Sequence, residues 1–357
     1  MIDKILEQFG ILEFKSDQLV SGLINKTWRI STKSQDYILQ RVNDNVFRKP
    51  GDVADNIQRI DDYLKENAPG YLFVASVNTT EGKPLVYIEA DGYYRLFPFV
   101  QGSHTINVVS SPEQAFEAAF QFGKFTKLLS GFEASSLHLT IPDFHNLTLR
   151  YRQFEDAITN GNGHRIRDVS NFINEIHAQK DIVVVFEDIR RNPSVKQRVT
   201  HHDTKISNVL FNDKTKGICV IDLDTVMPGY FFSDVGDMMR TYLSPANEEE
   251  KDFDKIEVRE DFFRAIVYGY LANMRDELSE DEKALIYYSG PFLIYMQAIR
   301  FLADHCNNDS YYGASYEGHN LNRAVNQLRL LNKYNEKKLL FQEIISKELQ
   351  SKNHHHS

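Results

Sequence analysis

The amino-acid sequence predicts an α+β protein with two lobes: a small lobe built on an antiparallel sheet, followed by a larger helical lobe. Three observations lead to this prediction. The chain has 357 residues, which is more than one compact core usually holds. Short runs rich in β-branched and aromatic residues dominate residues 1–100. Stretches with apolar residues at helical spacing dominate the remainder.

The small lobe is expected to be mostly sheet. Residues 1–11 predict a short amphipathic helix rather than a signal peptide. Residues 53–67 predict the one long helix of this lobe, because their apolar positions recur every three or four residues. Five runs of β-forming residues predict strands at 28–30, 37–42, 71–78, 84–90 and 93–100.

The larger lobe is expected to begin after residue 100 and to end near residue 350. Residues 110–132 predict its first helix, with a serine cap, a proline in the first turn and a glycine near the end. Residues 351–357, which include three consecutive histidines, are expected to be a disordered tail or a tag remnant. Further helices are predicted at 147–160, 168–180, 260–277, 282–305 and 320–350.

Composition and charge exclude several classes of protein. A hydrophobic content of 42% with 25% charged residues excludes a disordered chain. The net charge of -9 argues against a nucleic-acid partner, and no apolar run approaches the length of a membrane span. Cys219 and Cys306 lie in apolar surroundings without metal-ligand spacing, so we expect a reducing, cytoplasmic location.

The stretch HHDTKISNVLF at 201–211 crowds polar residues directly before a short strand. A second short strand follows a turn centred near Thr215, which predicts a hairpin. Asn208 then lies opposite Asp222, and Asp203 lies on the loop that reaches the same end of the hairpin. We therefore expect these three side chains to converge.

Their chemistry suits phosphoryl transfer. A carboxylate on such a loop can accept a hydroxyl proton or orient the hydroxyl. Amide and carboxylate oxygens are hard ligands, suited to Mg²⁺ on phosphates. A base aspartate, an asparagine and a later metal-binding aspartate divide the work in this way in kinases. A surface loop with Asx turns is the alternative interpretation.

The pattern HxDxxxxN followed by IDLD at 221–224 resembles the aminoglycoside phosphotransferase/choline kinase superfamily. The longer strings at 201–211, 219–229, 39–47 and 299–324 are similar to the N-acetylhexosamine 1-kinase family. The resemblance implies a two-lobed protein-kinase-like fold and ATP and Mg²⁺ as cofactors. It also implies an amino sugar as the small-molecule substrate, phosphorylated on its anomeric hydroxyl. Nucleotide binding would belong to residues 1–100, and catalysis and acceptor binding to residues 101–350.

Within this resemblance, Asp203 is the expected catalytic base, and Asn208 and Asp222 are the expected metal ligands. Asp224 lies two residues beyond Asp222, so on an extended chain both carboxylates face the same side. It is expected to bind the metal or a substrate hydroxyl, with stabilisation of the turn as the alternative. Lys205 is expected to neutralise the transferring phosphate, with a solvated lysine as the alternative.

Three further polar residues near the loop have structural interpretations. His201 and His202 are expected to be scaffold, with one of them hydrogen-bonded to hold the loop. Asp234 precedes VGDMMR and is predicted to cap a helix N-terminus. In the superfamily, the matching aspartate supports the catalytic loop.

The phosphates are expected under a strand–turn–strand loop at 21–30. Gly22 is its only glycine, and Asn25, Lys26 and Thr27 could donate to phosphate oxygens.

The protein-kinase pattern would place its strand lysine at Gln40 of YILQ. The nearest cation, Arg41, would point to the opposite face of a regular strand. Either a bulge turns Arg41 towards the phosphates, or other groups hold them. The helix at 53–67 has no evident glutamate partner for a strand cation, and Asp55 is its nearest acid. Phe99 lies in FPFVQG, a candidate hinge whose backbone would meet adenine, although an edge strand ending in a turn is equally consistent.

On the acceptor side, Arg300 and Tyr311 match positions that line the sugar pocket in the resemblance. Arg300 lies in an apolar helix, where a guanidinium needs a ligand or an acidic partner. A buried ion pair is the alternative for Arg300, and Tyr312 competes with Tyr311. Leu23 stands where that family has a histidine, which could change the sugar. An aminoglycoside, choline-like or amino-alcohol acceptor, or a nucleotide-binding pseudokinase, are the alternative functions.

Overall fold

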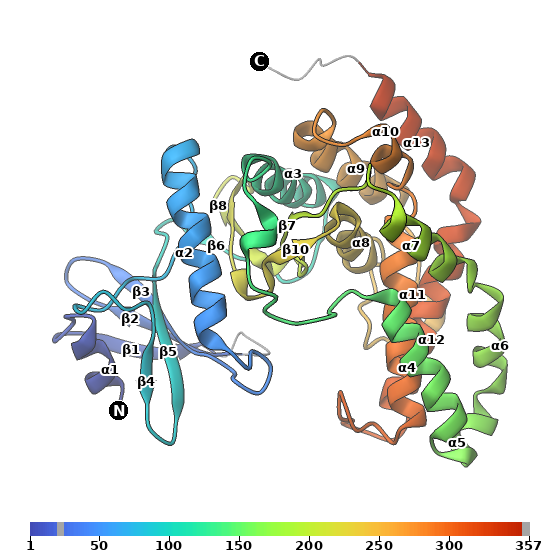
Figure 1. The fold of residues 1–357 in the computed structure, drawn as a ribbon, viewed down its shortest axis with the longest axis horizontal. Coiled ribbons are helices and arrows are strands. Elements are labelled where there is room, and N and C mark those ends of the chain that lie inside the picture. The colour runs from blue at the N-terminus through green and yellow to red at the C-terminus, as the bar shows by residue number, and fades with distance from the viewer. Residues whose placement is uncertain (20–24, 352–357) are drawn as a thin grey trace.

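A computed structural model describes residues 1–19 and 25–351 and has two lobes (Figure 1). A small lobe holds a five-stranded antiparallel sheet, and a larger lobe is mostly helical with two small sheets of short strands. The predicted α+β, two-lobed architecture is therefore confirmed. The tail predicted over 351–357 lies outside the described residues, apart from Ser351.

The sheet of the small lobe has a regular register, which determines the face of the sheet on which each basic side chain lies. Successive residues of a strand point to opposite faces, and directly paired residues share a face. Thr27 pairs with Gln40, and Gln40 pairs with Arg95, so these three residues share one face. Lys26 and Arg41 also pair and occupy the other face. In spatial order the strands are β1 (Lys15–Leu19), β2 (Lys26–Ser31), β3 (Asp36–Arg41), β5 (Gly92–Pro98) and β4 (Val86–Ile88).

Helix α1 (Ile2–Gln8) covers the sheet face that carries Arg41. Its Ile5 and Leu6 form a small core with Leu39 and Leu96, which lie on the same face as Arg41 by strand alternation. The opposite face is turned towards the helical lobe.

One predicted strand is wrong. Residues 71–78 are extended but make only an isolated bridge, between Val77 and Leu96. Strand β3 occupies one side of β5, and β4 occupies the other side as far as Tyr94. The rest of that side of β5 lies next to this segment, but only Val77 comes into register with it as a bridge.

Helix α2 (Pro50–Asn67) has the apolar face that its spacing predicted, and it stands between the sheet and the helical lobe (Figure 1). It begins at Pro50, whose fixed φ suits a first turn. Buried Asn56 attaches it to the larger lobe, because its Nδ2 donates to the carbonyls of His138 at 2.9 Å and Val226 at 3.1 Å. Asp55 contacts Arg59 and His138, so it does not face the sheet as a partner for a strand cation.

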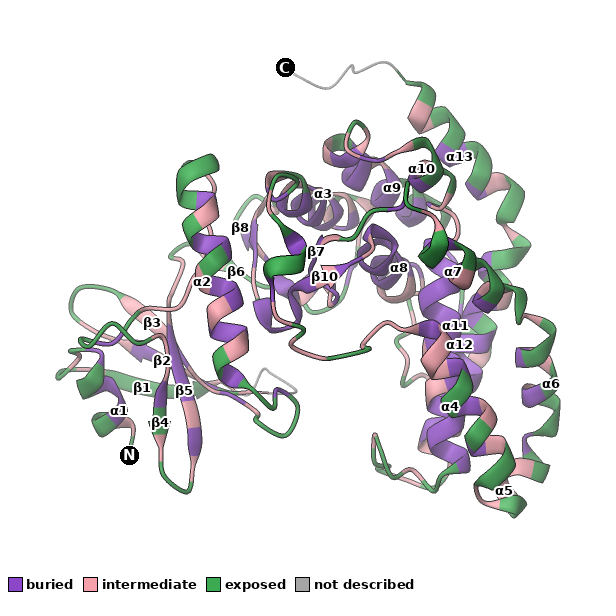
Figure 2. Ribbon diagram, in the orientation of Figure 1, coloured by how far each residue is buried: buried purple, intermediate pink, exposed green. Residues whose placement is uncertain are grey.

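The helical lobe is organised around α11, which is buried along most of its length (Figure 2). Helix α11 packs against α4, α8 and α12, and α3 packs against α9. The helices are α3 (Pro112–Leu128), α4 (Leu147–Asn160), α5 (Gly163–Asp168), α6 (Ser170–Ala178), α7 (Asp181–Arg191), α8 (Phe231–Tyr242), α9 (Glu260–Met274), α10 (Glu280–Ala284), α11 (Ser289–Cys306), α12 (His319–Glu336) and α13 (Lys338–Gln350).

Two helices predicted as continuous are each divided in two. The helix predicted at 282–305 is α10 followed by α11, and Pro291 lies in the first turn of α11, where proline is tolerated. The helix predicted at 320–350 breaks at Lys337. Packing explains this break, because the ring of Phe341 on α13 stacks on Phe263 of α9 with centroids 3.7 Å apart.

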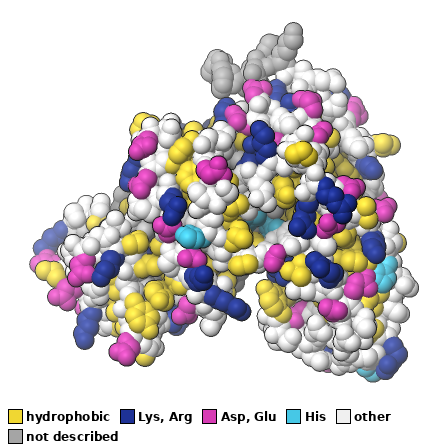
Figure 3. Space-filling model, in the orientation of Figure 1, with side chains coloured by type: hydrophobic (Ala, Val, Ile, Leu, Met, Phe, Trp, Pro, Cys, Tyr) yellow, Lys and Arg dark blue, Asp and Glu magenta, His cyan; other side chains and the backbone are white. Residues whose placement is uncertain are grey.

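The surface in Figure 3 has acidic and basic side chains interspersed, without a broad area of one sign on this face. Among the helices that the structure describes, none has the length and apolar character needed to cross a bilayer.

Candidate active site

The stretch quoted from 201–211 forms a loop that leads into a hairpin. The loop follows β7 (Arg198–Thr200), and a 3-10 turn at Ile206–Asn208 joins it to β8 (Val209–Asn212). Strand β9 (Gly217–Val220) pairs antiparallel with β8, and Thr215 between them has a left-handed φ of 58°. The predicted hairpin is therefore present.

The register of this hairpin differs by one residue from the predicted one. Val209 pairs with Val220, and the N–H of Ile221 donates to the carbonyl of Asn208 at 2.9 Å. Asn208 therefore lies opposite Ile221 rather than Asp222. The backbone of Asp222 is left-handed, with φ of 59°, and it turns the chain at the end of the hairpin.

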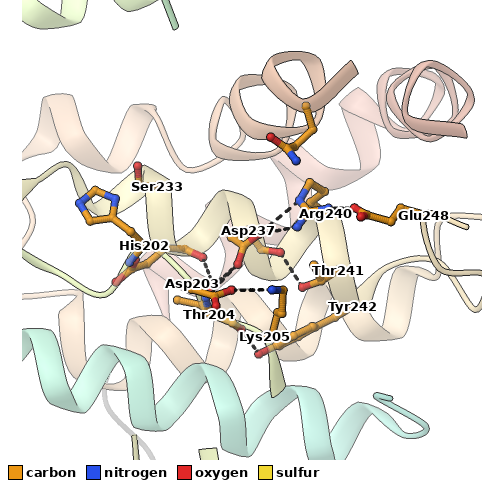
Figure 4. Close-up of polar contacts among 12 residues, drawn as sticks. His202, Asp203, Thr204, Lys205, Ser233, Asp237, Arg240, Thr241, Tyr242 and Glu248 are labelled. Atoms are coloured by element: carbon orange, nitrogen blue, oxygen red, sulfur yellow. Dashed lines mark hydrogen bonds and ion pairs between the residues drawn. The ribbon is translucent and has the colours of Figure 1, made fainter. Parts of the chain in front are cut away.

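The polar side chains nevertheless converge at this end. Nδ2 of Asn208 donates to the backbone carbonyl of Asp203 at 2.9 Å. The carboxylate of Asp203 lies 3.2 Å from Nζ of Lys205 (Figure 4). Burial opposes the charge of Lys205, but the charges of Asp203 and Asp237 outweigh it and raise the pKa of Lys205.

Asp222 carries a strongly perturbed carboxylate. It is accessible to solvent, yet many protein atoms lie around it. This desolvation, with the negative charges of Asp224 and Asp203, raises the pKa of Asp222 to about 7. Bringing a cation to these oxygens would relieve the mutual repulsion.

Asp234 supports the loop rather than capping a helix. Helix α8 begins at Phe231, so Asp234 lies inside its first turn and the predicted N-cap role is wrong. Its carboxylate accepts the backbone N–H of His201 at 3.0 Å and that of His202 at 2.7 Å. Burial raises the pKa of Asp234 to about 7, although both hydrogen bonds oppose that shift.

A second acid on α8 holds the next residue of the loop. The N–H of Thr204 donates to Asp237 Oδ2 at 2.8 Å. Arg240 donates to the other oxygen of Asp237, with Nε at 3.2 Å, and its Nη1 donates to Glu248 at 2.8 Å (Figure 4). The loop is thus anchored residue by residue to a buried charged network.

The two histidines of the loop are scaffold, as expected. The ring of His201 contacts the carbonyl of Ile221 at 3.0 Å and packs edge-on against Phe122 of α3. His202 has a left-handed φ of 67°, and burial lowers its pKa to about 3, so its ring is neutral near pH 7. Its Nδ1 lies 3.3 Å from Nδ1 of His145.

The predicted phosphate donors lie in different places. Asn25 reaches across to the other lobe, where its Nδ2 donates to Asp224 Oδ2 at 3.0 Å. Thr27 is buried on the sheet face shared with Gln40, whereas exposed Lys26 lies on the opposite face. Gly22 and Leu23 lie outside the described residues.

Arg41 is not brought to the site. Strand β3 is regular at this position, without the bulge that would turn the side chain round. The guanidinium pairs instead with Asp91, at 3.3 Å from Nε to Oδ1, on the face that α1 covers. Of the two alternatives, the one that remains is that groups other than Arg41 hold the phosphates.

The segment at 97–102 connects the small sheet to the catalytic hairpin. The N–H of Phe99 donates to the carbonyl of Asp36 at 3.0 Å, and the guanidinium of Arg29 lies 4.3 Å from the centre of the Phe99 ring. Strand β6 (Ser103–His104) follows and pairs with β8. A ligand held along this segment would therefore lie beside both lobes.

The acceptor candidates lie together at the end of α11. The guanidinium of Arg300 lies 5.4 Å from the centre of the Tyr312 ring and 5.9 Å from that of Tyr311. Asp304 fixes this loop by accepting the N–H of Tyr311 at 2.7 Å and that of Tyr312 at 2.9 Å. Tyr311 is 71% exposed, whereas Tyr312 is partly buried.

Arg300 has no acidic partner in the part of the chain that the structure describes. Its Nη1 donates to Gln297 at 2.8 Å, and its only other described contacts are aromatic rings. Arg150 likewise forms no ion pair with a described residue, and burial together with the charge of Arg300 lowers its pKa. The alternative of a buried structural ion pair at Arg300 is therefore not supported among these residues.

Comparison with known proteins identifies the family. The model of the phosphotransferase enzyme family matches residues 17–273, which is more than half of the chain. The chain belongs to this family.

Solved structures show the same fold for the phosphotransferase. An aminoglycoside phosphotransferase from Alicyclobacillus acidocaldarius has 15% identity and a TM-score of 0.64, over 97% of this chain and 95% of that one. An amicoumacin kinase in complex with AMP-PNP and Ca²⁺ has 14% identity and a TM-score of 0.59, over 97% and 93%. Choline kinase from Cryptosporidium parvum has 13% identity and a TM-score of 0.55, over 95% and 94%. The predicted two-lobed, protein-kinase-like fold is confirmed.

Sequence reasoning missed two polar residues that contact the candidate site. Arg95, on β5, donates to Asp224 and Gln40 and is 3% exposed. A cation at an alternating position of the apolar run YYRLFPFV was the available signal, because a buried arginine needs partners. The second missed residue is Asp237. Its spacing of three residues from Arg240 on a buried helix was the available sign of an internal ion pair.

Gly229 gives a test of how tightly the phosphotransferase holds its loop. A Cβ at Gly229, the last residue of β10 (Met227–Gly229), would lie 2.3 Å from Cε1 of the buried His202 ring. Gly229→Ala is expected to displace the loop and lower kcat about 100-fold, as small misplacements of catalytic groups do. Steady-state kinetics would measure this, with Gly51→Ala as the control, because a Cβ at Gly51 meets nothing within 4 Å. Wild-type kcat for Gly229→Ala would contradict the prediction.

Proposed function

We propose that this phosphotransferase transfers the terminal phosphoryl group of ATP, with Mg²⁺, to the anomeric hydroxyl of an N-acetylhexosamine or a closely related sugar. The products would be ADP, a sugar 1-phosphate and a proton. The family supports the reaction class. The observation that carries the acceptor is a pair of arginines, Arg150 and Arg300, that form no ion pair with a described residue and lie near the exposed ring of Tyr311.

Asp203 is assigned to the acceptor hydroxyl. Its carboxylate is partly exposed on the loop, at 20%, and it can accept the hydroxyl proton or orient the hydroxyl. Hydrogen bonds from the loop backbone to Asp234 and Asp237 fix the position of this carboxylate in advance. Much of the rate enhancement would come from such positioning, because phosphoryl transfer asks little covalent chemistry of the protein.

The residues beside Asp203 fit a hard divalent cation. The carboxylate of Asp222 makes no hydrogen bond with a described residue, and the amide oxygen of Asn208 likewise accepts none. We assign these two side chains to Mg²⁺, which prefers oxygen ligands. Bound there, the metal would neutralise charge on the nucleotide phosphates. Asp224 fits this role less well, because Arg95 and Asn25 bind its oxygens. The complex of the amicoumacin kinase with AMP-PNP and Ca²⁺ supports a nucleotide with a divalent metal.

The acceptor side lies next to the catalytic loop. Arg300 faces the Phe144 ring, with the guanidinium 6.0 Å from its centre, and Phe144 stacks on His145 with centroids 4.4 Å apart. His145 in turn contacts His202, the neighbour of Asp203. A molecule bound against Arg300 is therefore close to the Asp203 loop.

Charge on this side selects among the acceptor classes. Two unpaired guanidinium groups repel a cationic acceptor such as choline, an amino alcohol or an aminoglycoside. The hydroxyl and acetamido oxygens of a neutral sugar can instead accept hydrogen bonds from arginine. The exposed ring of Tyr311 offers a flat apolar surface for the sugar ring.

An ATP-consumption screen with defined acceptors tests this proposal. N-acetylglucosamine and N-acetylgalactosamine are expected to be consumed, whereas choline and aminoglycosides are not. Methyl glycosides of the same sugars are the matched control, because their anomeric oxygen is blocked, and they are expected to be inert. Phosphorus NMR of the product would place the phosphate. Turnover only with cationic acceptors, or equal turnover of the methyl glycosides, would contradict the proposal.

A further inference from the structure

Among the described residues, the sheet face turned towards the helical lobe carries one buried cation, Arg95, whose role is unassigned. Gln40 stands where the kinase pattern has its strand lysine, and Arg41 is paired with Asp91 on the other face. We propose that Arg95, from the neighbouring strand β5, supplies the cation that binds the nucleotide phosphates. Gln40 and Asp224 would hold its guanidinium in place. This inference rests on the proposed use of ATP, but it does not depend on which acceptor is used.

The sheet register places Arg95 directly beside the lysine position. Gln40 and Arg95 are paired residues of β3 and β5, so their side chains leave the same face of the sheet. Oε1 of Gln40 accepts hydrogen bonds from Nε of Arg95 at 3.1 Å and from Nη2 at 2.9 Å. Compared with the kinase pattern, the cation lies one strand further along the sheet, on β5 instead of β3. Gln40, at the lysine position, holds this cation through hydrogen bonds.

The other side of the guanidinium is held by the helical lobe. Nη2 of Arg95 donates to Asp224 Oδ2 at 2.8 Å, and Nη1 contacts the second oxygen of the same carboxylate. Both side chains are only 3% exposed, so the pair is shielded from solvent. Asp224 lies two residues from Asp222, and the positive charge of Arg95 acts on the Asp222 carboxylate. Arg95 is therefore beside the proposed metal ligand.

The hydrogen bonds of Arg95 leave a donor for a ligand. A guanidinium has five N–H donors. Nε uses its one on Gln40, Nη2 uses two on Gln40 and Asp224, and Nη1 uses one on Asp224. One N–H of Nη1 has no described acceptor, and we assign this donor to a phosphate oxygen while the other four fix the group. Arginine suits this role because its planar fork binds phosphate and carboxylate alike.

The pair of Arg95 with Asp224 corresponds in function to the lysine–glutamate pair of protein kinases, in which an acid on a helix orients the strand lysine. In this chain Asp55 of α2 contacts Arg59 and His138 instead. The orienting acid comes from the helical lobe, so the phosphate-binding cation also joins the two lobes. Asn25, from the small lobe, donates to the same carboxylate.

Binding of a nucleotide series to the full chain tests the proposal without any acceptor. Arg95→Gln is expected to weaken ADP binding about 10- to 100-fold, the usual loss for a charge-assisted hydrogen bond, and to leave adenosine binding unchanged. Isothermal titration would give both affinities. Arg95→Lys keeps the charge and is expected to recover part of the ADP affinity. Arg41→Gln is the matched control on the opposite face of the same sheet, and both of its affinities are expected to equal those of the wild type.

An exchange variant covers the case in which Arg95→Gln does not fold. Gln40→Lys combined with Arg95→Gln keeps one cation and one amide in the same strand pair, with the lysine on the usual strand. It is expected to prefer ADP to adenosine as the wild type does. Loss of that preference would overturn the proposal, as would an Arg95→Gln protein with wild-type ADP affinity or with equal losses for adenosine and ADP. A wild-type protein that does not bind ADP at all would overturn the proposed function, and this inference with it.

Discussion

Asp203→Asn is expected to lower kcat by about 10²- to 10⁴-fold, the usual contribution of a general base. The asparagine amide cannot accept the hydroxyl proton, although it occupies the same volume. The loop should keep its shape, because Asn208 contacts the backbone carbonyl of residue 203 rather than the side chain. Thermal unfolding is therefore expected to change little, and steady-state kinetics with a saturating acceptor would measure the loss.

Asp213→Asn is the matched control for this change. Asp213 lies in the exposed turn of the same hairpin, and the same substitution there is expected to leave kcat as in the wild type. A wild-type kcat for Asp203→Asn would contradict the assignment of Asp203 as the catalytic base. An equal loss in both variants would point to a general effect on the hairpin.

Asp222→Asn is expected to raise the Mg²⁺ concentration required for half-maximal activity at least about 100-fold. Removing a partner of a metal ligand already costs about 10- to 100-fold in metal affinity, and removing a ligand itself should cost at least as much. Activity measured against Mg²⁺ concentration would show the shift. An unchanged Mg²⁺ requirement would contradict the assignment of Asp222 as a metal ligand.

The same variant has an expected effect on stability that separates ligand loss from misfolding. The pKa of Asp222 is raised to about 7, so the charged carboxylate is disfavoured in the folded protein relative to the unfolded chain. Removing the charge at pH 8, above that pKa, should therefore stabilise the fold. Asparagine also tolerates the left-handed backbone of this residue. The unfolding temperature without Mg²⁺ is expected to stay the same or rise, whereas a clear fall would indicate that the variant is misfolded.

Local patterns were sufficient for part of the site. The hairpin brings Asn208 and Asp222 to one end because few residues separate them. They still converge there, although the register differs by one residue from the prediction. Strand alternation alone placed Arg41 on the face opposite to Gln40. The apolar spacing of 53–67 likewise predicted the buried face of α2.

Other features depended on packing between distant segments. Asp234 has the sequence context of a helix cap, yet α8 begins earlier and its carboxylate turns to the loop backbone. The segment at 71–78 has β-forming residues but makes only one bridge to β5, between Val77 and Leu96. Neither outcome follows from propensity, because each depends on which partners remain available once the rest of the chain has folded.

The sequence by itself determined the candidate reaction centre of this protein, since Asp203, Asn208 and Asp222 belong to one loop and hairpin whose geometry is set by short-range pairing. Only the tertiary structure decided which cation faces that centre. Arg95 and Asp224 are 129 residues apart and come from different lobes, so no local pattern joins them. Their pairing follows from the docking of the sheet on the helical lobe. This docking buries both charges, and a buried charge is strongly destabilising unless an opposite charge lies beside it.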